Sequence, residues 1–93
     1  MSGKRPNETR LRELLTRLRE RLGQARSVDA DARKHLSALV SDIDRELGKG
    51  ADSGTASAHA PRLESLAVRF EADHPGLAEV IREVIDALVR VGI

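Results

Sequence analysis

Stretches in which large apolar side chains recur every three or four residues alternate along this chain with stretches that lack them. The first periodic stretch covers residues 8–22. Its five leucines are Leu11, Leu14, Leu15, Leu18 and Leu22. This spacing is close to 3.6 residues and predicts a helix with one apolar face. Asn7 is expected to cap the helix, and Gly23 to end it in a left-handed conformation.

The second periodic stretch predicts a helix over residues 29–47, with Ser27 or Asp29 as its N-cap and Gly48 as its end. Its apolar positions are Ala32, Leu36, Leu39, Val40, Ile43 and Leu47. The connection of six or seven residues between the two helices is typical of an antiparallel hairpin. In such a hairpin, we expect the basic edge of the first helix to face the acidic edge of the second. These edges consist of Arg10, Arg17 and Arg21, and of Asp42 and Glu46.

Residues 48–60 contain only small or polar side chains and predict a flexible Gly/Ala/Ser linker. Two further helices are predicted over residues 61–73 and 75–91, because a residue before proline is pushed out of helical conformation. We therefore expect one all-α domain over residues 1–93. It consists of an N-terminal hairpin (8–47), the linker, and a C-terminal hairpin (61–93) that forms a four-helix bundle or an intertwined dimer.

The last helix has the widest apolar surface, about 140° of an ideal helical wheel. This sector comprises Leu77, Val80, Ile81, Val84, Ile85, Leu88 and Val91. One neighbouring helix does not cover so wide a sector, so this helix is expected at the centre of the bundle or at a subunit interface. A charge in the core, as in Leu18→Asp or Val84→Asp, is expected to unfold the protein or abolish its assembly.

The segment Arg69-Phe70-Glu71-Ala72-Asp73-His74-Pro75 precedes an amphipathic helix that ends in Val91-Gly92-Ile93. Together with the leucine-rich opening, the linker and the length, it resembles small bacterial proteins of domain-of-unknown-function family 4404. The resemblance covers most of the chain, and it implies a small helical protein in a family with no established activity. Some members carry a chromosome-partitioning label, but this chain lacks the glycine-rich phosphate loop of a partitioning ATPase.

Composition narrows the classes of function. The 93 residues include no cysteine, which excludes disulfides, thiolate metal sites and cysteine nucleophiles, and Phe70 is the only aromatic residue. The start of the chain lacks the apolar stretch of a secretory signal, and no apolar run is long enough to span a membrane. We therefore expect a cytoplasmic protein without membrane association. A thin aliphatic core at this length also favours a homo-oligomer, a dimer first of all.

Charge is unevenly distributed. Residues 1–26 contain eight Lys or Arg and three Glu, whereas residues 27–50 have a net charge of −1 and residues 51–93 a net charge of −3. The basic residues of the first segment are Lys4, Arg5, Arg10, Arg12, Arg17, Arg19, Arg21 and Arg26. They are candidates for binding nucleic-acid phosphates. However, they split between two edges of the predicted helix with glutamates between them, and no exposed aromatic side chain accompanies them.

Few residues are candidates for chemistry. Glu71 and His74 have the Glu-x-x-His spacing of di-iron bundles, but the second copy that such a site needs is absent from the sequence. His35 follows Asp31 by four residues, the spacing of an ordinary surface pair, and His59 lies in the predicted linker without an evident partner. We therefore expect no catalytic, cofactor-binding or metal-binding residues and no cofactor.

These patterns favour a non-enzymatic, self-associating helical interaction or scaffold module. Its hairpins are expected to pair through the last helix and the leucine stripe of the first, and another protein partner is compatible with the same surfaces. The alternative is weak nucleic-acid association through the basic first helix.

Overall fold

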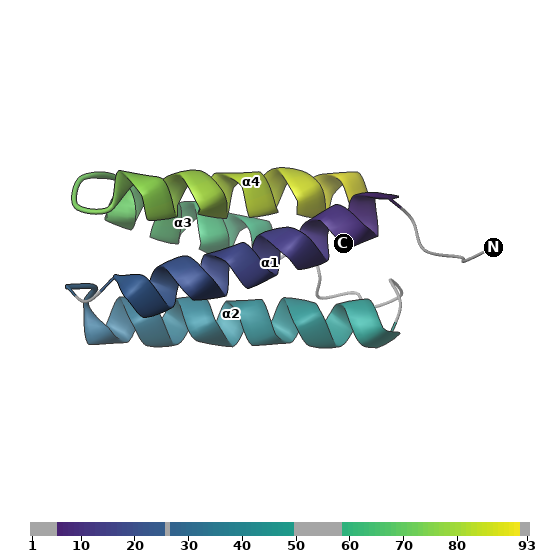
Figure 1. Cartoon of the computed structure of the whole chain (residues 1–93), viewed down its shortest axis with the longest axis horizontal. Helices are drawn as coiled ribbons and strands as arrows, with labels where there is room; N and C mark the ends of the chain where they lie inside the picture. The colour runs from purple at the N-terminus through teal and green to yellow at the C-terminus, as the bar shows by residue number, and fades with distance from the viewer. Residues whose placement is uncertain (1–5, 26, 50–58, 92–93) are drawn as a thin grey trace.

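The computed structural model describes residues 6–25, 27–49 and 59–91, and every element in these ranges is a helix. The helices are α1 (Pro6–Gln24), α2 (Ala30–Lys49), α3 (His59–Glu71) and α4 (Pro75–Val91). They lie side by side, and each runs antiparallel to the next along the chain (Figure 1). The predicted all-α four-helix bundle is confirmed. Most of the predicted linker, residues 50–58, lies outside the described residues.

The helix ends differ from the prediction by one or two residues at most positions. Asn7 lies inside α1, which begins at Pro6, where proline is compatible with a first turn. Gly23 and Gly48 do not end their helices, because α1 continues to Gln24 and α2 to Lys49. The backbone at Gly23 is helical and not left-handed. The amide of Ala25 still donates to the carbonyl of Arg21 at 3.0 Å, which extends the helical bonding beyond the glycine.

Polar side chains fix the turn between α1 and α2. Oδ2 of Asp29 accepts a hydrogen bond from the amide of Ala32 at 3.2 Å, so Asp29 and not Ser27 is the N-cap of α2. The guanidinium of Arg33 donates to the carbonyl oxygen of Leu22 at 3.0 Å and to that of Ala25. A cation at these carbonyls satisfies the C-terminal end of α1 and its dipole. The sequence pattern instead predicts a glycine in this role.

The core runs the length of the bundle and is made of aliphatic side chains and Phe70. The apolar residues predicted for α1 and α2 are all buried, and Leu18 and Val84 have no exposed surface. The wide apolar sector of α4 is covered by both α3 and α1, so α4 is the most extensively packed helix, although each of the four helices has two neighbours and none is central. The expected contact between α4 and the leucine stripe of α1 therefore forms within one chain.

The segment that carries the family resemblance forms the turn between α3 and α4. Phe70 is buried in the core, and its carbonyl accepts a hydrogen bond from the amide of His74 at 2.6 Å. The carbonyl of His74 accepts from the amides of Leu77 and Ala78 at 3.0 and 3.1 Å, which starts α4 with Pro75 in the first position. This segment has a structural role, because it reverses the chain direction.

Candidate docking groove between α2 and α3

An open groove of about 470 Å³ runs between α2 and α3. Four residues of each helix line it. They are His35, Ala38, Leu39 and Asp42 of α2, and Arg62, Ser65, Leu66 and Arg69 of α3. Leu39 and Leu66 form an apolar floor, since they retain only 5% and 6% of their surface. Charged or polar side chains of both helices form the rims.

The groove is open because α2 and α3 pack less extensively than α4 packs against its neighbours. Ala38 and Ser65 each precede a floor residue in the sequence, and both have short side chains. At these positions the helices therefore leave space that larger side chains would fill. A concave surface with an apolar floor and a few polar groups is the usual form of a binding site in an uncharacterised protein.

A side-chain contact that links α2, or the residue before it, to α3 closes each end of the groove. At one end, Nε2 of His59 lies 3.3 Å from Oε2 of Glu46, and His59 is buried at the first position of α3. At the other end, the guanidinium of Arg69 lies 3.2 Å from Oδ2 of Asp29. The prediction that His59 lies in a linker without a partner is thus wrong. The linker composition concealed it, because the helix begins two residues before Pro61.

The rims carry charge of both signs that the bundle leaves unpaired. Asp42 on α2 and Arg62 on α3 line the same groove, yet neither forms an ion pair with any residue in the described ranges. The side chain of Arg62 is exposed, and that of Asp42 is half-buried. Both groups are therefore available to a charged residue of another molecule.

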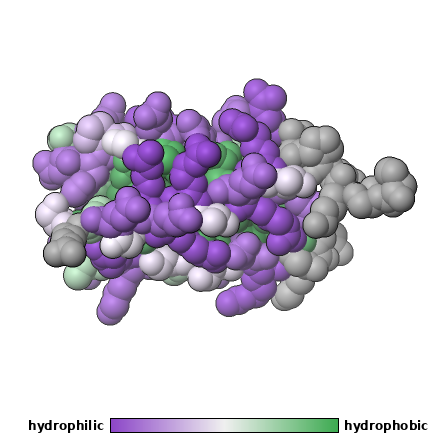
Figure 2. Space-filling view, in the orientation of Figure 1, coloured by the Kyte–Doolittle hydropathy of each residue, from purple (hydrophilic) through white to green (hydrophobic). Residues whose placement is uncertain are grey.

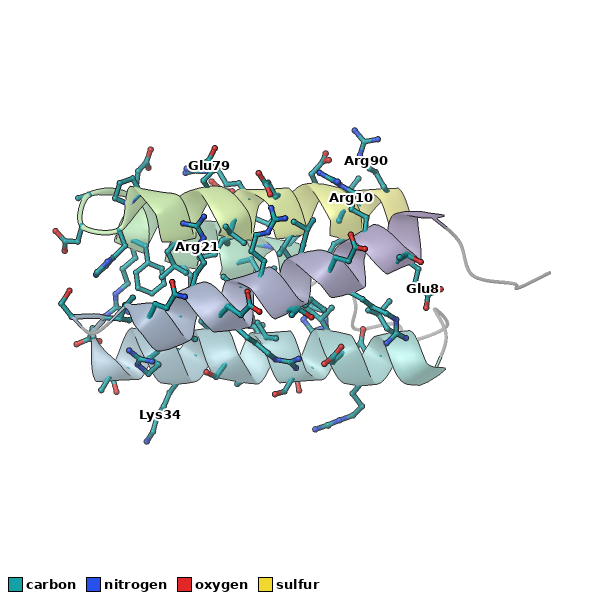
Figure 3. All side chains as sticks on the ribbon, in the orientation of Figure 1. Glu8, Arg10, Arg21, Lys34, Glu79 and Arg90 are labelled. Atoms are coloured by element: carbon teal, nitrogen blue, oxygen red, sulfur yellow. The ribbon has the colours of Figure 1, made fainter. Side chains whose placement is uncertain are left out.

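The candidate nucleic-acid residues of α1 do not form one basic surface. Figure 3 shows Arg10 and Arg21 directed toward α4, and Arg10 lines a shallow surface pocket together with Glu79 and Glu83. The edge of α1 that faces α2 instead carries Arg19, whose guanidinium lies 2.6 Å from the carboxylate of Asp44.

The expected contact of Arg10, Arg17 and Arg21 with Asp42 and Glu46 is therefore wrong. A helical period identifies the edges of a face but not the neighbour that each edge meets.

Within the described part of α1, the expected pair of Glu8 and Arg12 forms at 3.6 Å, whereas that of Glu13 and Arg17 does not. The remaining candidates Lys4, Arg5 and Arg26 lie outside the described residues. The face around α1 is predominantly polar, with narrow apolar strips between the helices (Figure 2).

The two residues with metal-ligand spacing have different partners. Oε1 of Glu71 lies 3.4 Å from the guanidinium of Arg82, whereas the His74 imidazole lies 3.4 Å from the hydroxyl of Ser27 and packs edge-on against Phe70. Over residues 6–25, 27–49 and 59–91, no three His, Asp or Glu side chains come together as metal ligands would. His35 lies on the rim of the groove and not in a pair with Asp31.

The fold and the groove define a class of protein: a small antiparallel four-helix bundle with an open interhelical groove. The chain belongs to the family described as a domain of unknown function, DUF4404, which matches residues 11–93. No curated protein and no solved structure matches the chain. None of the helices described above is long and apolar enough to cross a membrane.

Proposed function

We propose that this protein is a non-enzymatic helical interaction module that self-associates as a dimer through the groove between α2 and α3. The observation that carries the proposal is the groove itself, which combines an apolar floor with unpaired charge on both rims. A groove of this kind accepts side chains of another molecule. The proposal includes a scaffold role and a location in the cytoplasm.

Charge favours a second copy of the chain as the occupant. Asp42 lies on the α2 rim and Arg62 on the α3 rim, so the surface presents an acidic group beside a basic one. A two-fold dimer brings the same patch of both subunits together, and a patch with both charges side by side complements itself. A partner with a single sign of charge would match only one rim.

The dimer proposed here is an association of folded bundles and not an exchange of hairpins. The apolar faces of all four helices are already covered within one chain, including Leu18 and Val84, which have no exposed surface. Association therefore adds the groove to a core that is complete without it. Interfaces with so small an apolar area are weak and transient.

Nucleic-acid association remains the alternative, and the arrangement of α1 supports it less well. Phosphate binding needs a surface with one sign of charge, whereas Arg10 lies beside Glu79 and Glu83. If the alternative holds, the protein will retard DNA or RNA in a gel at low salt, and Arg10→Ala will weaken this retardation.

The proposed function is tested by sedimentation equilibrium of the full chain over a concentration series. The test variant is Ala38→Glu, because Ala38 is exposed and lines the groove, so a larger charged side chain there fills the groove without disturbing the core. The control is Ser41→Glu, which adds the same side chain to α2 at an exposed position outside the groove.

We expect the wild type and Ser41→Glu to dimerise equally and Ala38→Glu to sediment as a monomer, with the same helical circular-dichroism signal in all three proteins. A wild-type monomer at every concentration would contradict the proposed function. Equal dimerisation of Ala38→Glu would show that self-association uses another surface.

A further inference from the structure

We propose that the two copies meet face to face about a two-fold axis parallel to the helices, so that α2 of each subunit lies on α3 of the other. In this arrangement, Asp42 of one subunit pairs with Arg62 of the partner subunit, and the pair occurs twice. This inference rests on the proposed self-association, and it specifies the surface, the partner and the symmetry.

The first step is the alignment of α2 with α3. The two contacts that close the groove, Glu46 with His59 and Asp29 with Arg69, show that the helices run antiparallel. Asp42 lies one turn before Glu46, and Arg62 lies about one turn after His59. The two unpaired charges therefore lie at the same level, near the end of the groove that His59 closes.

The other end of the groove has a different composition. Arg69 and His35 lie at the level near Asp29, and Leu39 and Leu66 lie between the two ends. Arg69 already pairs with a carboxylate. Asp42 and Arg62 each have no oppositely charged partner among the described residues. The two charges without a partner therefore lie on opposite rims at the same end of the groove, near His59.

Among the two-fold axes in the plane of the interface, two keep the helices of both subunits aligned, and their electrostatic consequences differ. An axis parallel to the helices places α2 on α3 of the partner at the same level, so Asp42 meets Arg62 of the partner subunit. An axis perpendicular to the helices, in the plane of the interface, places α3 on α3 and α2 on α2 with the levels reversed. Arg62 then meets Arg69 of the partner subunit, and Asp42 meets His35 of the partner subunit. The two arginine contacts join like charges, whereas the parallel axis joins Asp42 to an arginine twice, and this difference favours the parallel axis.

The apolar floor gives the same arrangement its short-range attraction. Leu39 and Leu66 lie near the middle of the groove, and Ala38 exposes its methyl group beside them. Face-to-face contact covers the Ala38 methyl group and the small surface that Leu39 and Leu66 retain, so the apolar gain is modest. The second surface pocket of the bundle lacks such a floor. Its lining is mostly charged, from Glu71, Glu79, Glu83 and Asp86 to Arg10 and Arg82.

A charge-swap experiment tests the inference. Asp42→Arg and Arg62→Asp are made separately, and each is analysed alone and in an equimolar mixture by sedimentation equilibrium. In the homodimer of either variant, positions 42 and 62 of the two subunits carry like charges, and this contact occurs twice. In the mixed heterodimer, the arginine introduced at position 42 meets the aspartate introduced at position 62, and the native Asp42 meets the native Arg62, so both pairs are restored. Glu13→Arg and Arg45→Asp are the matched controls, since both positions are exposed and lie outside the groove.

We expect each groove variant alone to dimerise at least about tenfold more weakly than the wild type, a change of about 1.4 kcal/mol. The mixture is expected to recover the wild-type affinity, and the control variants are expected to keep it. Stronger dimerisation of Arg62→Asp alone would overturn the parallel axis. A wild-type dimer that neither substitution affects would overturn the inference and leave the proposed function standing, whereas a wild-type monomer would contradict the proposed function.

Discussion

Single side chains at the N-terminal end of α2 determine how this helix is held in the bundle. Asp29 has two roles, because the same carboxylate oxygen caps α2 through Ala32 and lies 3.2 Å from Arg69 of α3. Arg33 ties the first turns of α2 to the last carbonyls of α1. Together, these two residues join three helices at one end of the molecule by charge-assisted contacts.

Gly23 is the residue at which the structure departs most clearly from the usual pattern of helix ends. Its backbone is helical, and a Cβ at this position would meet no atom within 4 Å apart from those of the adjacent residues and of the backbone of α1. Gly23→Ala is therefore expected to raise the free energy of unfolding by up to about 1 kcal/mol, since alanine is the better helix former. Urea unfolding followed by circular dichroism measures this change.

Gly76→Ala provides the comparison for that experiment. A Cβ at Gly76 would lie 3.0 Å from Nη1 of Arg21, so the arginine must move and the gain is expected to be smaller. If Gly23→Ala lowers the stability instead, the residue has the left-handed conformation of a helix end, and the helical assignment at this position is wrong.

At the level of elements, periodicity predicted the helices and their buried faces well. The leucines of α1 and the apolar residues of α2 are buried as expected, because a repeat near 3.6 residues defines one face of a helix without any tertiary information. The edges of those faces were harder to predict. Arg19 contacts α2 and Arg10 faces α4, and this choice depends on the order of the helices around the bundle.

The groove could be predicted only in part. The sequence predicts Asp42 as an edge residue of the second helix, but its neighbour across the groove depends on where α3 begins. The sequence predicts that start at Pro61, whereas the helix begins at His59, whose contact with Glu46 aligns α2 with α3. Ala38 and Ser65 are not singled out by the sequence analysis, although small residues beside an apolar stripe are a signal for space between packed helices.

The second helix is the least extensively packed element of the bundle. Elements with fewer contacts open more readily, so we expect the backbone amides of α2 to exchange with solvent faster than those of α4. Native-state hydrogen exchange measured residue by residue tests this expectation. Protection in α2 that equals or exceeds that of α4, at core positions such as Ile43 and Ile81, would contradict it.

At the level of the whole molecule, the bundle is complete as a single chain. All four helices contribute to one core, and Val68 and Val89 are the large apolar side chains that stay exposed in the described part of the chain. Self-association therefore adds to a folded unit and does not create it. This explains why the proposed dimer surface is small and polar at its rims, as transient interfaces are.

The most specific sequence feature of the family has a structural explanation at this scale. Phe70 and His74 make the turn between α3 and α4, and Ser27 connects that turn to the one between α1 and α2. The segment that carries the family resemblance therefore stabilises the end of the bundle at which the α1–α2 and α3–α4 turns lie. Of this segment, Arg69 also lines the groove, so the resemblance and the proposed function share one residue and otherwise rest on different ones.

The most direct test of self-association through the groove is a dilution series of the uniformly ¹⁵N-labelled full chain, followed by amide chemical shifts. We predict concentration-dependent shifts at residues 35–42 of α2 and 62–69 of α3, saturating together along a single dimerisation curve. The outward face of α1, including Glu13 and Arg17, is predicted to keep its shifts. Shifts that do not change on dilution, or that change on the face of α1 and α4 instead, would contradict docking through this groove.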